Sequence, residues 1–228
     1  MASLYLIRHG QASFGAENYD SLSDLGVDQC RRLGVWWRER GLAPARVLVG
    51  PMVRHRQSAE AFAEGFAQPL EWLTLNGLAE FDHENVLEVY RPDFVDKTVI
   101  ANFLASSPSP RQAFHQIFKE AINRWHDGRF DGEYNESWPH FRERVLVTFD
   151  QLRSESGDAL VFTSGGVVSV MVQKALALSD AHCFAINGLI HNSSVTRMLY
   201  SGDAASLHSL NSTAHLDIHN DAKLLTYR

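Results

Sequence analysis

Short runs of apolar residues alternate along this chain with longer segments in which apolar residues recur every three or four positions. The runs Leu4–Ile7, Val47–Val49 and Ala159–Phe162 are bounded by glycine or charged residues, as is typical of buried strands. Between them, helical spacing extends from Ser23, a good N-cap, to about Arg40, and from Pro51 to Phe66. This alternation predicts an α/β fold with a mainly parallel sheet.

The stretch from Asp82 to Pro139 differs from the rest of the chain. It is richer in polar and aromatic residues, lacks the alternation of strands, and contains the breaker Ser-Ser-Pro-Ser-Pro at 106–110. We therefore expect one domain, residues 1–228, with a helical insertion at about 82–139. Further strands are expected at Leu70–Leu75, Val195–Tyr200 and Leu207–Leu210.

The charge balance argues against several classes of partner. The 228 residues include 27 acidic and 21 basic side chains, which gives a net charge of −6 with neutral histidines. Such a chain has no overall attraction to nucleic acid or to an anionic membrane, and no window approaches the ~20 apolar residues of a spanning helix. Cys30 and Cys183 form neither a disulfide framework nor a metal motif. Since we find no signal-peptide pattern, we expect a cytoplasmic protein without nucleic-acid or membrane partners.

Arg8, His9 and Gly10 follow the first predicted strand directly. Ligands of α/β sheets bind at the carboxyl ends of strands, so we expect these residues at a binding site. A neutral imidazole can attack phosphorus, and a guanidinium can hold two phosphate oxygens. The three residues therefore indicate phosphoryl chemistry, although alone they are also typical of a structural histidine at a strand end.

Two further charged residues follow predicted strands. Arg54 lies in the first turn of a helix, where the N–H groups and the helix dipole favour an anion. His55 falls on the apolar stripe of that helix and is interpreted as a core residue. Glu80 lies between Leu78 and Phe81, whose burial is expected to raise the pKa of its carboxyl group toward that of a general acid. Taken singly, Arg54 and Glu80 are also explained as solvated surface residues.

Several motifs occur in a fixed order along nearly the whole chain. They are Arg-His-Gly at 8–10, Leu-Ser-x-x-Gly-x-x-Gln at 22–29, Pro-x-x-Arg-x-x-Gln-Ser-Ala at 51–59, Leu-x-Glu at 78–80, and a strand-turn-helix from Ala159. Together they resemble the histidine phosphatase superfamily, which has the phosphoglycerate mutase-like fold. The resemblance implies a three-layer fold, in which helices flank a mostly parallel central sheet and the insertion forms a lid. It also implies a phosphohistidine intermediate and no cofactor or metal.

The resemblance also implies roles for individual residues. His9 is the phosphorylated nucleophile, Arg8 and Arg54 bind the phosphoryl group, and Glu80 donates a proton to the leaving group. Gln11 is expected to complete the anion pocket.

One position departs from the family pattern. Members usually carry a second histidine where this chain has Ser164, immediately before Gly165 and Gly166. The Gly-rich turn still directs backbone N–H groups at an anion, and Ser164 can act as a neutral donor. A charged donor is lost, and removal of one such donor costs about 10²–10³ in rate. His83 is an auxiliary candidate, and Ser164 and Gly165 are assigned to phosphate binding.

These features predict a phosphoric-monoester hydrolase that acts on a small phosphorylated substrate; they specify no oligomeric state. A phospholigand-binding module without turnover is the main alternative, because Ser164 replaces the second histidine. A phosphate mutase is less favoured, since the insertion lacks a basic cluster for a second phosphate. Ser164 as the nucleophile of an ester hydrolase is disfavoured, because Phe162 replaces the glycine of that motif. The pattern His215-x-Asp217-x-His219 lacks a fourth zinc ligand and is interpreted as a polar tail.

Overall fold

The computed structural model describes residues 1–13, 20–43, 45–202 and 204–227. The sequence predicts a polar loop that extends to Asp20 and a stop of the first helix at Pro44, but residues 14–19 and 44 lie outside these ranges. The chain divides into two compact units, Met1–Glu80 with Val145–Arg228, and Phe81–Arg144. None of the helices in the described ranges is long and apolar enough to cross a membrane.

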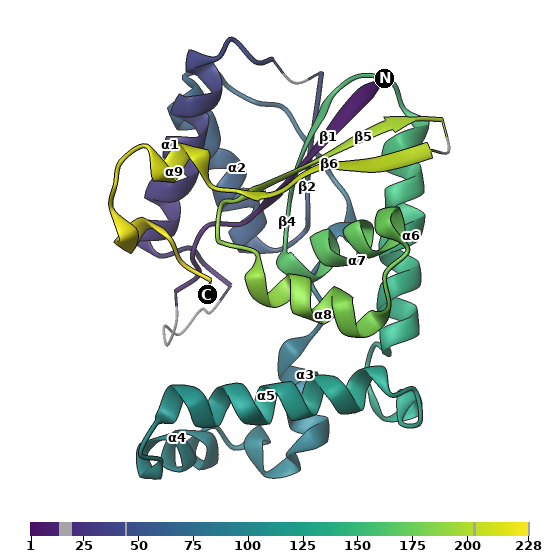
Figure 1. Cartoon of the computed structure of the whole chain (residues 1–228). Helices are drawn as coiled ribbons and strands as arrows, with labels where there is room; N and C mark the ends of the chain where they lie inside the picture. Colours follow the sequence, from purple (N-terminus) through teal and green to yellow (C-terminus); the bar gives the residue numbers. More distant parts are fainter. Residues whose placement is uncertain (14–19, 44, 203, 228) are drawn as a thin grey trace. The chain divides into compact units, whose positions relative to one another are not determined.

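In the part of the chain that the structure describes, a six-stranded sheet lies at the centre of the first unit (Figure 1). The strand order is β3-β2-β4-β1-β5-β6. The first four of these strands are parallel, whereas β5 runs antiparallel to β1, and β6 antiparallel to β5. The mostly parallel sheet is thus confirmed. The strands are β1 Ala2–Arg8, β2 Arg46–Val49, β3 Leu73–Thr74, β4 Ala159–Thr163, β5 Val195–Ser201 and β6 Ala204–Ser212.

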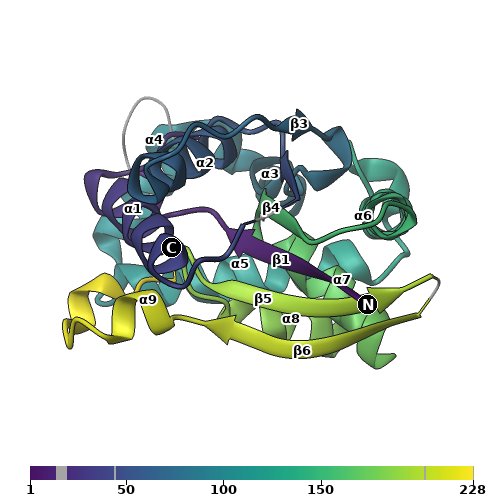
Figure 2. The same ribbon diagram turned by 90° about the horizontal axis from the view of Figure 1, so that it is seen from above.

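Helices cover both faces of this sheet, so the three-layer α/β prediction is confirmed. α1 and α2 lie on one face, and α7 and α8 lie on the other (Figures 1 and 2). Every residue of β4 is buried because both faces are covered. The helices of the first unit are α1 Asp24–Glu39, α2 Val53–Phe66, α7 Gly165–Leu176, α8 Asp180–Leu189 and α9 Ala214–Asp217, with 3₁₀ turns η1 Asn76–Leu78 and η4 Ala222–Leu224.

Local signals set several element ends, and two expectations need correction. Ser23 caps α1 as predicted, since its hydroxyl accepts a hydrogen bond from the Gly26 N–H at 3.1 Å. α2 begins at Val53 and not at Pro51, because Met52 is still extended. The third strand shrinks to two exposed residues at the sheet edge, where it pairs with β2 alone. The sequence reasoning missed α8.

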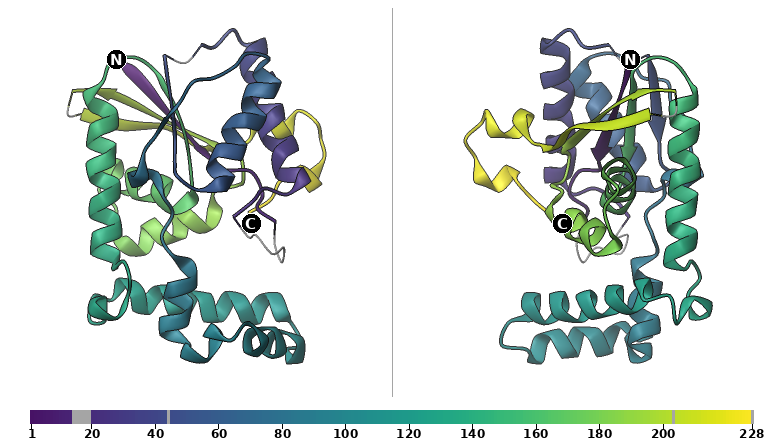
Figure 3. Two further views of the ribbon diagram at one scale, coloured as in Figure 1. Left: turned by 180° about the vertical axis from the view of Figure 1, so that it is seen from behind. Right: turned by 45° about the vertical axis from the view of Figure 1, so that its right-hand side comes forward.

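The second unit is helical. It contains α3 His83–Tyr90, α4 Lys97–Ser106 and α5 Pro110–His126, with 3₁₀ turns η2 Pro92–Val95 and η3 Asp131–Glu133 (Figure 3). α6, Trp138–Ser154, starts in this unit and continues into the first. The ring of Phe81 stacks on Trp125 at 4.8 Å between centroids and meets Phe141 edge-on at 5.6 Å. The unit therefore has an aromatic core of its own, while its role as a lid stays a prediction.

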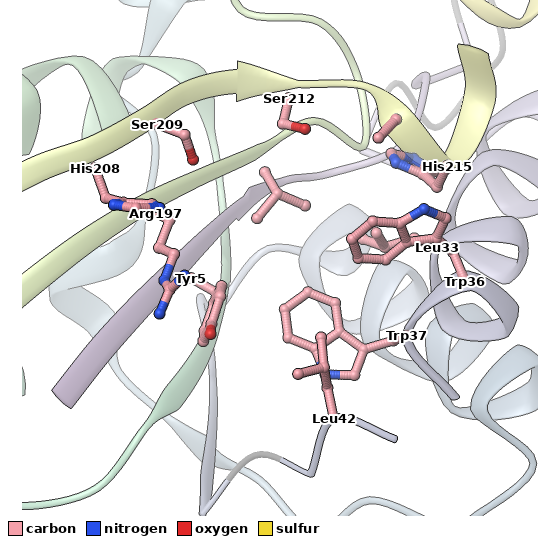
Figure 4. Close-up of a pocket in the computed structure, with 12 residues that line it drawn as sticks. Tyr5, Leu33, Trp36, Trp37, Leu42, Arg197, His208, Ser209, Ser212 and His215 are labelled. Carbon is pink, nitrogen blue, oxygen red and sulfur yellow. The ribbon is translucent and has the colours of Figure 1, made fainter. Parts of the chain in front are cut away.

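A mostly apolar cavity of about 240 Å³ lies against the α1 side of the sheet. Trp37, Tyr5 and Leu33 line it together with side chains of β5 and β6 (Figure 4). None of the residues proposed from the sequence for catalysis or phosphate binding is among its lining residues. The predicted catalytic and phosphate-binding residues therefore lie outside this cavity.

His215, at the border of this cavity, is not part of a polar tail. Its side chain is 2% exposed in the short helix α9, and its Nε2 lies 2.8 Å from the Ser193 hydroxyl. Burial, helped by nearby His219, lowers its pKa to about 3. Within the described residues, no group of three metal-binding side chains comes together.

The buried His215 predicts a pH dependence of stability. It stays neutral in the folded protein, but in the unfolded chain it takes up a proton as the pH falls through its ordinary value of 6.5. The unfolded state then binds more protons, so stability falls with pH from about 6.5 toward about 3. Between about pH 6 and 5, the unfolding free energy of the wild type is expected to decrease more steeply than that of His215→Gln, by up to ~1.4 kcal/mol per pH unit. His208→Gln, at an exposed position of β6, is the control, and equal slopes for wild type and His215→Gln would contradict the assignment.

Candidate active site

The carboxyl ends of three neighbouring strands meet at one edge of the sheet. The carbonyl of Thr163, the last residue of β4, accepts a hydrogen bond from the His9 N–H at 2.9 Å. The carbonyl of Phe162 accepts one from the Gly50 N–H, also at 2.9 Å. In addition, the Thr163 hydroxyl donates to the Leu78 carbonyl at 2.8 Å. These bonds bring together the segments that carry Arg8 and His9, Arg54, Glu80 and Ser164.

The His9 ring is held as a neutral imidazole. Its Nδ1 faces a backbone carbonyl, and its Nε2 keeps an unprotonated lone pair. Nδ1 lies 2.7 Å from the Gly10 carbonyl oxygen, which can only accept, so Nδ1 carries the proton. Burial lowers the pKa of His9 well below its ordinary value, and Arg54, Arg8 and His55 lower it further. A neutral ring with an unprotonated Nε2 is the form of histidine that acts as a nucleophile.

The backbone on either side of the His9 ring is fixed from two directions. The His9 carbonyl accepts from the Ser193 N–H at 3.1 Å and from the Asn192 side-chain amide at 3.2 Å. On the other side, the Gly10 N–H donates to the Ser58 hydroxyl at 3.1 Å. A side chain at Gly10 would lie 2.2 Å from the Gly26 carbonyl oxygen, so only glycine fits this contact with α1.

Arg54 is buried at the start of α2 and paired with an acidic residue. Its guanidinium donates to one carboxylate oxygen of Asp20 at 2.7 Å, and the other oxygen accepts from the Val53 N–H at 2.8 Å. Asp20 thus caps the helix and orients Arg54 at the same time. The arginine is 4% exposed, so the solvated-surface interpretation of this residue is wrong.

Arg8 reaches toward the N-terminus of α7. Its guanidinium donates to the Ile190 carbonyl, and its Nε lies 3.7 Å from the position that a Cβ at Gly165 would occupy. Because both Arg8 and Arg54 lower the pKa of His9, two guanidinium groups act on the same imidazole. Two guanidinium groups beside a helix N-terminus in a largely buried place are suited to an anion.

Glu80 is bound at the same helix N-terminus. Its Oε2 accepts from the Gly166 N–H at 3.0 Å, in the first turn of α7, where the helix dipole favours a negative charge. Ser164, the N-cap residue of α7, is fully buried. Three consecutive residues of the Gly-rich turn, Ser164, Gly165 and Gly166, thus lie at the site, and Gly166 binds Glu80.

Gln11 and His83 were the remaining candidates. The Gln11 side-chain carbonyl accepts from the Ser23 hydroxyl at 2.9 Å, which ties it to the N-terminus of α1. Its role in the anion pocket stays a prediction. His83 is the first residue of α3 in the helical unit, and its auxiliary role also stays a prediction.

The sequence reasoning missed one residue of the site, Asp20, because Arg54, which it holds, is distant in the sequence. The turn His191–Ser194 is interpreted from the sequence as structural, and its Asn192 side chain donates to the His9 carbonyl. The sequence reasoning also did not connect His55 with Ser164. His55 is buried, as expected, but its Nε2 lies 2.6 Å from the Ser164 hydroxyl. The available signal was the position of His55 next to Arg54, in the first turn of a helix that follows a strand.

Comparisons with known proteins identify the family and the fold of this chain. The sequence matches the family model of the histidine phosphatase superfamily (branch 1) over residues 4–97 and 105–213. A search of the curated proteins finds no match.

Several solved structures share the fold. A phosphoglycerate mutase from Bacillus anthracis str. Sterne superposes with a TM-score of 0.65 at 16% identity, over 96% of this chain and 97% of that one. A phosphoserine phosphatase from Entamoeba histolytica, solved with 3-phosphoglyceric acid, gives 0.60 at 17% identity, over 95% and 100%. An alpha-ribazole phosphatase from Shigella flexneri gives 0.58 at 15% identity, over 93% and 97%.

The buried arginine predicts the anion affinity of the site. Arg54→Ala removes a charge-assisted hydrogen bond worth ~1.5–3 kcal/mol, so we expect the affinity for inorganic phosphate, measured by calorimetry, to fall at least about tenfold. Arg56→Ala is the matched control, because Arg56 lies on the same helix with 57% of its side chain exposed. If Arg54→Ala folds normally and binds phosphate as the wild type does, Arg54 does not hold the anion.

Proposed function

The chain belongs to the histidine phosphatase superfamily (branch 1), and on that premise we propose that it hydrolyses phosphoric monoesters through a phosphorylated His9. The observation that carries the proposal is the hydrogen bond between His9 Nδ1 and the Gly10 carbonyl at 2.7 Å. It leaves Nε2 unprotonated in a buried setting beside Arg8 and Arg54. The proposed substrate is a small phosphorylated molecule, the class that the sequence analysis predicts.

In the first step, His9 Nε2 attacks phosphorus and the bond to the leaving-group oxygen breaks. Glu80, in its protonated form, gives its proton to that oxygen, and an alcohol leaves. Arg8, Arg54 and the N–H groups at the start of α7 stabilise the charge on the phosphoryl oxygens. The ring gains positive charge when Nε2 bonds phosphorus, and the Gly10 carbonyl stabilises that charge through Nδ1–H.

In the second step, water attacks the phosphohistidine. The Glu80 carboxylate takes a proton from the water as its oxygen bonds phosphorus, and the bond between phosphorus and Nε2 breaks. Inorganic phosphate leaves, His9 returns to the neutral ring, and Glu80 is protonated again. The same carboxyl group thus serves as the acid in the first step and as the base in the second.

A second candidate function is supported by Ser164. A neutral hydroxyl in place of a histidine weakens charge stabilisation during transfer more than it weakens anion binding, which favours a module that binds phospholigands without turnover. A phosphate mutase is the third candidate, since a mutase is among the proteins of the same fold. The cytoplasmic location expected from the sequence stays a prediction.

Replacement of the nucleophile separates the first two candidates. We expect wild type to release inorganic phosphate from a panel of phosphomonoesters without added metal, and His9→Ala to release none above background. A ³²P-labelled substrate, quenched during turnover, is expected to leave an acid-labile, base-stable label on wild type and none on the variant. His208→Ala serves as the histidine control. Folded wild type that binds phosphate but neither turns over nor takes up label would favour the binding module.

The proposed acid predicts a dependence on the leaving group. Glu80→Gln keeps a side-chain oxygen for the Gly166 N–H but has no proton to donate. With an alkyl phosphate we expect kcat to fall by about 10²–10⁴, the range of general acid–base catalysis. With p-nitrophenyl phosphate, whose leaving group needs no proton, formation of the phosphoenzyme in a single turnover should be nearly unaffected. If Glu80→Gln slowed phosphoenzyme formation equally with the alkyl phosphate and with p-nitrophenyl phosphate, Glu80 would not be the proton donor.

A further inference from the structure

A buried histidine and a buried serine meet directly beside the nucleophile. His55 Nε2 and Ser164 Oγ lie 2.6 Å apart, and both side chains are fully buried. The His55 ring centroid is 5.8 Å from that of His9, with the ring planes at 37°. The pair joins the first turn of α2 to the N-cap of α7, which are 109 residues apart in the sequence.

The hydrogen bond between His55 and Ser164 is not needed to cap the N-terminus of α7. A serine at an N-cap ordinarily uses its hydroxyl to accept from the first turn of the helix. Ser164 is the N-cap of α7, yet its side chain makes no capping hydrogen bond and binds His55 instead. The first turn of α7 is served by Glu80, which accepts from Gly166. The Ser164 hydroxyl is therefore available for another partner.

The chain also makes room for the His55 ring. A Cβ at Gly50 would lie 2.2 Å from His55 Nδ1 and 2.8 Å from the Leu78 carbonyl oxygen, so any larger residue would displace the imidazole. Gly50 is the residue whose N–H fixes the end of β2 to β4. The same backbone contact that builds the site thus sets the position of His55.

A neutral His55 with its proton on Nε2 would begin a chain of hydrogen-bond donors through Ser164. Burial and the neighbouring Arg54 lower the pKa of His55 well below its ordinary value, so the ring is neutral and carries one N–H. With that proton on Nε2, His55 donates to Ser164 Oγ, and the hydroxyl proton is left to point elsewhere. A hydroxyl that accepts one hydrogen bond is a stronger donor of the next.

We propose that Ser164 is a catalytic residue that donates a hydrogen bond to an oxygen of the transferring phosphoryl group, and that His55 is its positioning residue. This inference rests on the proposed function. Ser164 lies at the helix N-terminus that also holds Glu80, and His55 fixes the orientation of its hydroxyl. No proton changes owner in the process, because both groups act only through hydrogen bonds that strengthen as charge grows on the phosphoryl oxygens.

Three variants test the pair as a unit. Ser164→Ala removes the donor, His55→Leu removes the positioning group at similar volume, and His55→Gln retains an N–H close to the position of Nε2. We expect kcat to fall about 10²-fold in Ser164→Ala and to a similar extent in His55→Leu. The double variant should lose no more than Ser164→Ala alone, because groups that act in series are not additive. His55→Gln should recover at least tenfold over His55→Leu.

The opposite pattern overturns the proposal. If wild type turns over and Ser164→Ala matches it, Ser164 is no donor. If His55→Leu costs as much in the Ser164→Ala background as in the wild type, His55 acts structurally and not through the serine. Unfolding curves of each variant establish that comparisons are made on folded protein.

A binding measurement keeps the test independent of turnover. Orthovanadate mimics the transferring phosphoryl group, so both single variants should weaken its binding more than tenfold while changing the affinity for inorganic phosphate less than threefold. This difference is expected even if wild type proves to be a binding module. The proposed hydrolysis would then be wrong, whereas the proposed role of Ser164 and His55 at the phosphoryl oxygen would be supported. Vanadate affinity that is unchanged in both variants would contradict the pair while leaving phosphohistidine chemistry at His9 intact.

Discussion

The last two carbonyl groups of β4 accept hydrogen bonds from the backbone N–H groups of His9 and Gly50, each at 2.9 Å. β4 is buried on both faces between β1 and β2, so its end is one of the most constrained points of the sheet. One neighbour delivers the nucleophile and the other delivers the helix with Arg54. The strand itself runs on into Ser164 and α7. The position of every group in the proposed mechanism therefore depends on this strand end.

Electrostatics then decides what such a place can bind. Burial and two guanidinium groups keep His9 neutral, which preserves the Nε2 lone pair. Asp20 orients Arg54, and Glu80 occupies the N-terminus of α7 through the Gly166 N–H. A phosphoryl group brings negative charge to a site rich in cations and N–H donors, where low dielectric makes each interaction stronger than in water.

The sequence predicts the parts of the site that depend on local order. Arg8 and His9 end an apolar run, and Arg54 starts the helix after another, so topology alone brings them to one edge. Contacts between distant segments were beyond this reasoning. The pairing of His55 with Ser164 spans 109 residues, and a stripe of apolar positions gives no hint of it. His215 was interpreted as part of a polar tail. Its hydrogen-bond partner, Ser193, lies in a turn that is buried only in the folded sheet, so the local sequence does not reveal the contact.

The central claim is that the fold holds His9 as a neutral imidazole with its proton on Nδ1. Nitrogen-15 NMR of histidine-labelled protein between about pH 5 and 8, with His9→Ala to assign the signals, tests this directly. We predict one His9 nitrogen of the protonated type, one of the unprotonated type, and no titration near its ordinary pKa of 6.5. The lone-pair nitrogen should be Nε2 and should change its shift when vanadate binds. A His9 ring that gains a proton near pH 6.5, or that carries its neutral proton on Nε2, would contradict the account.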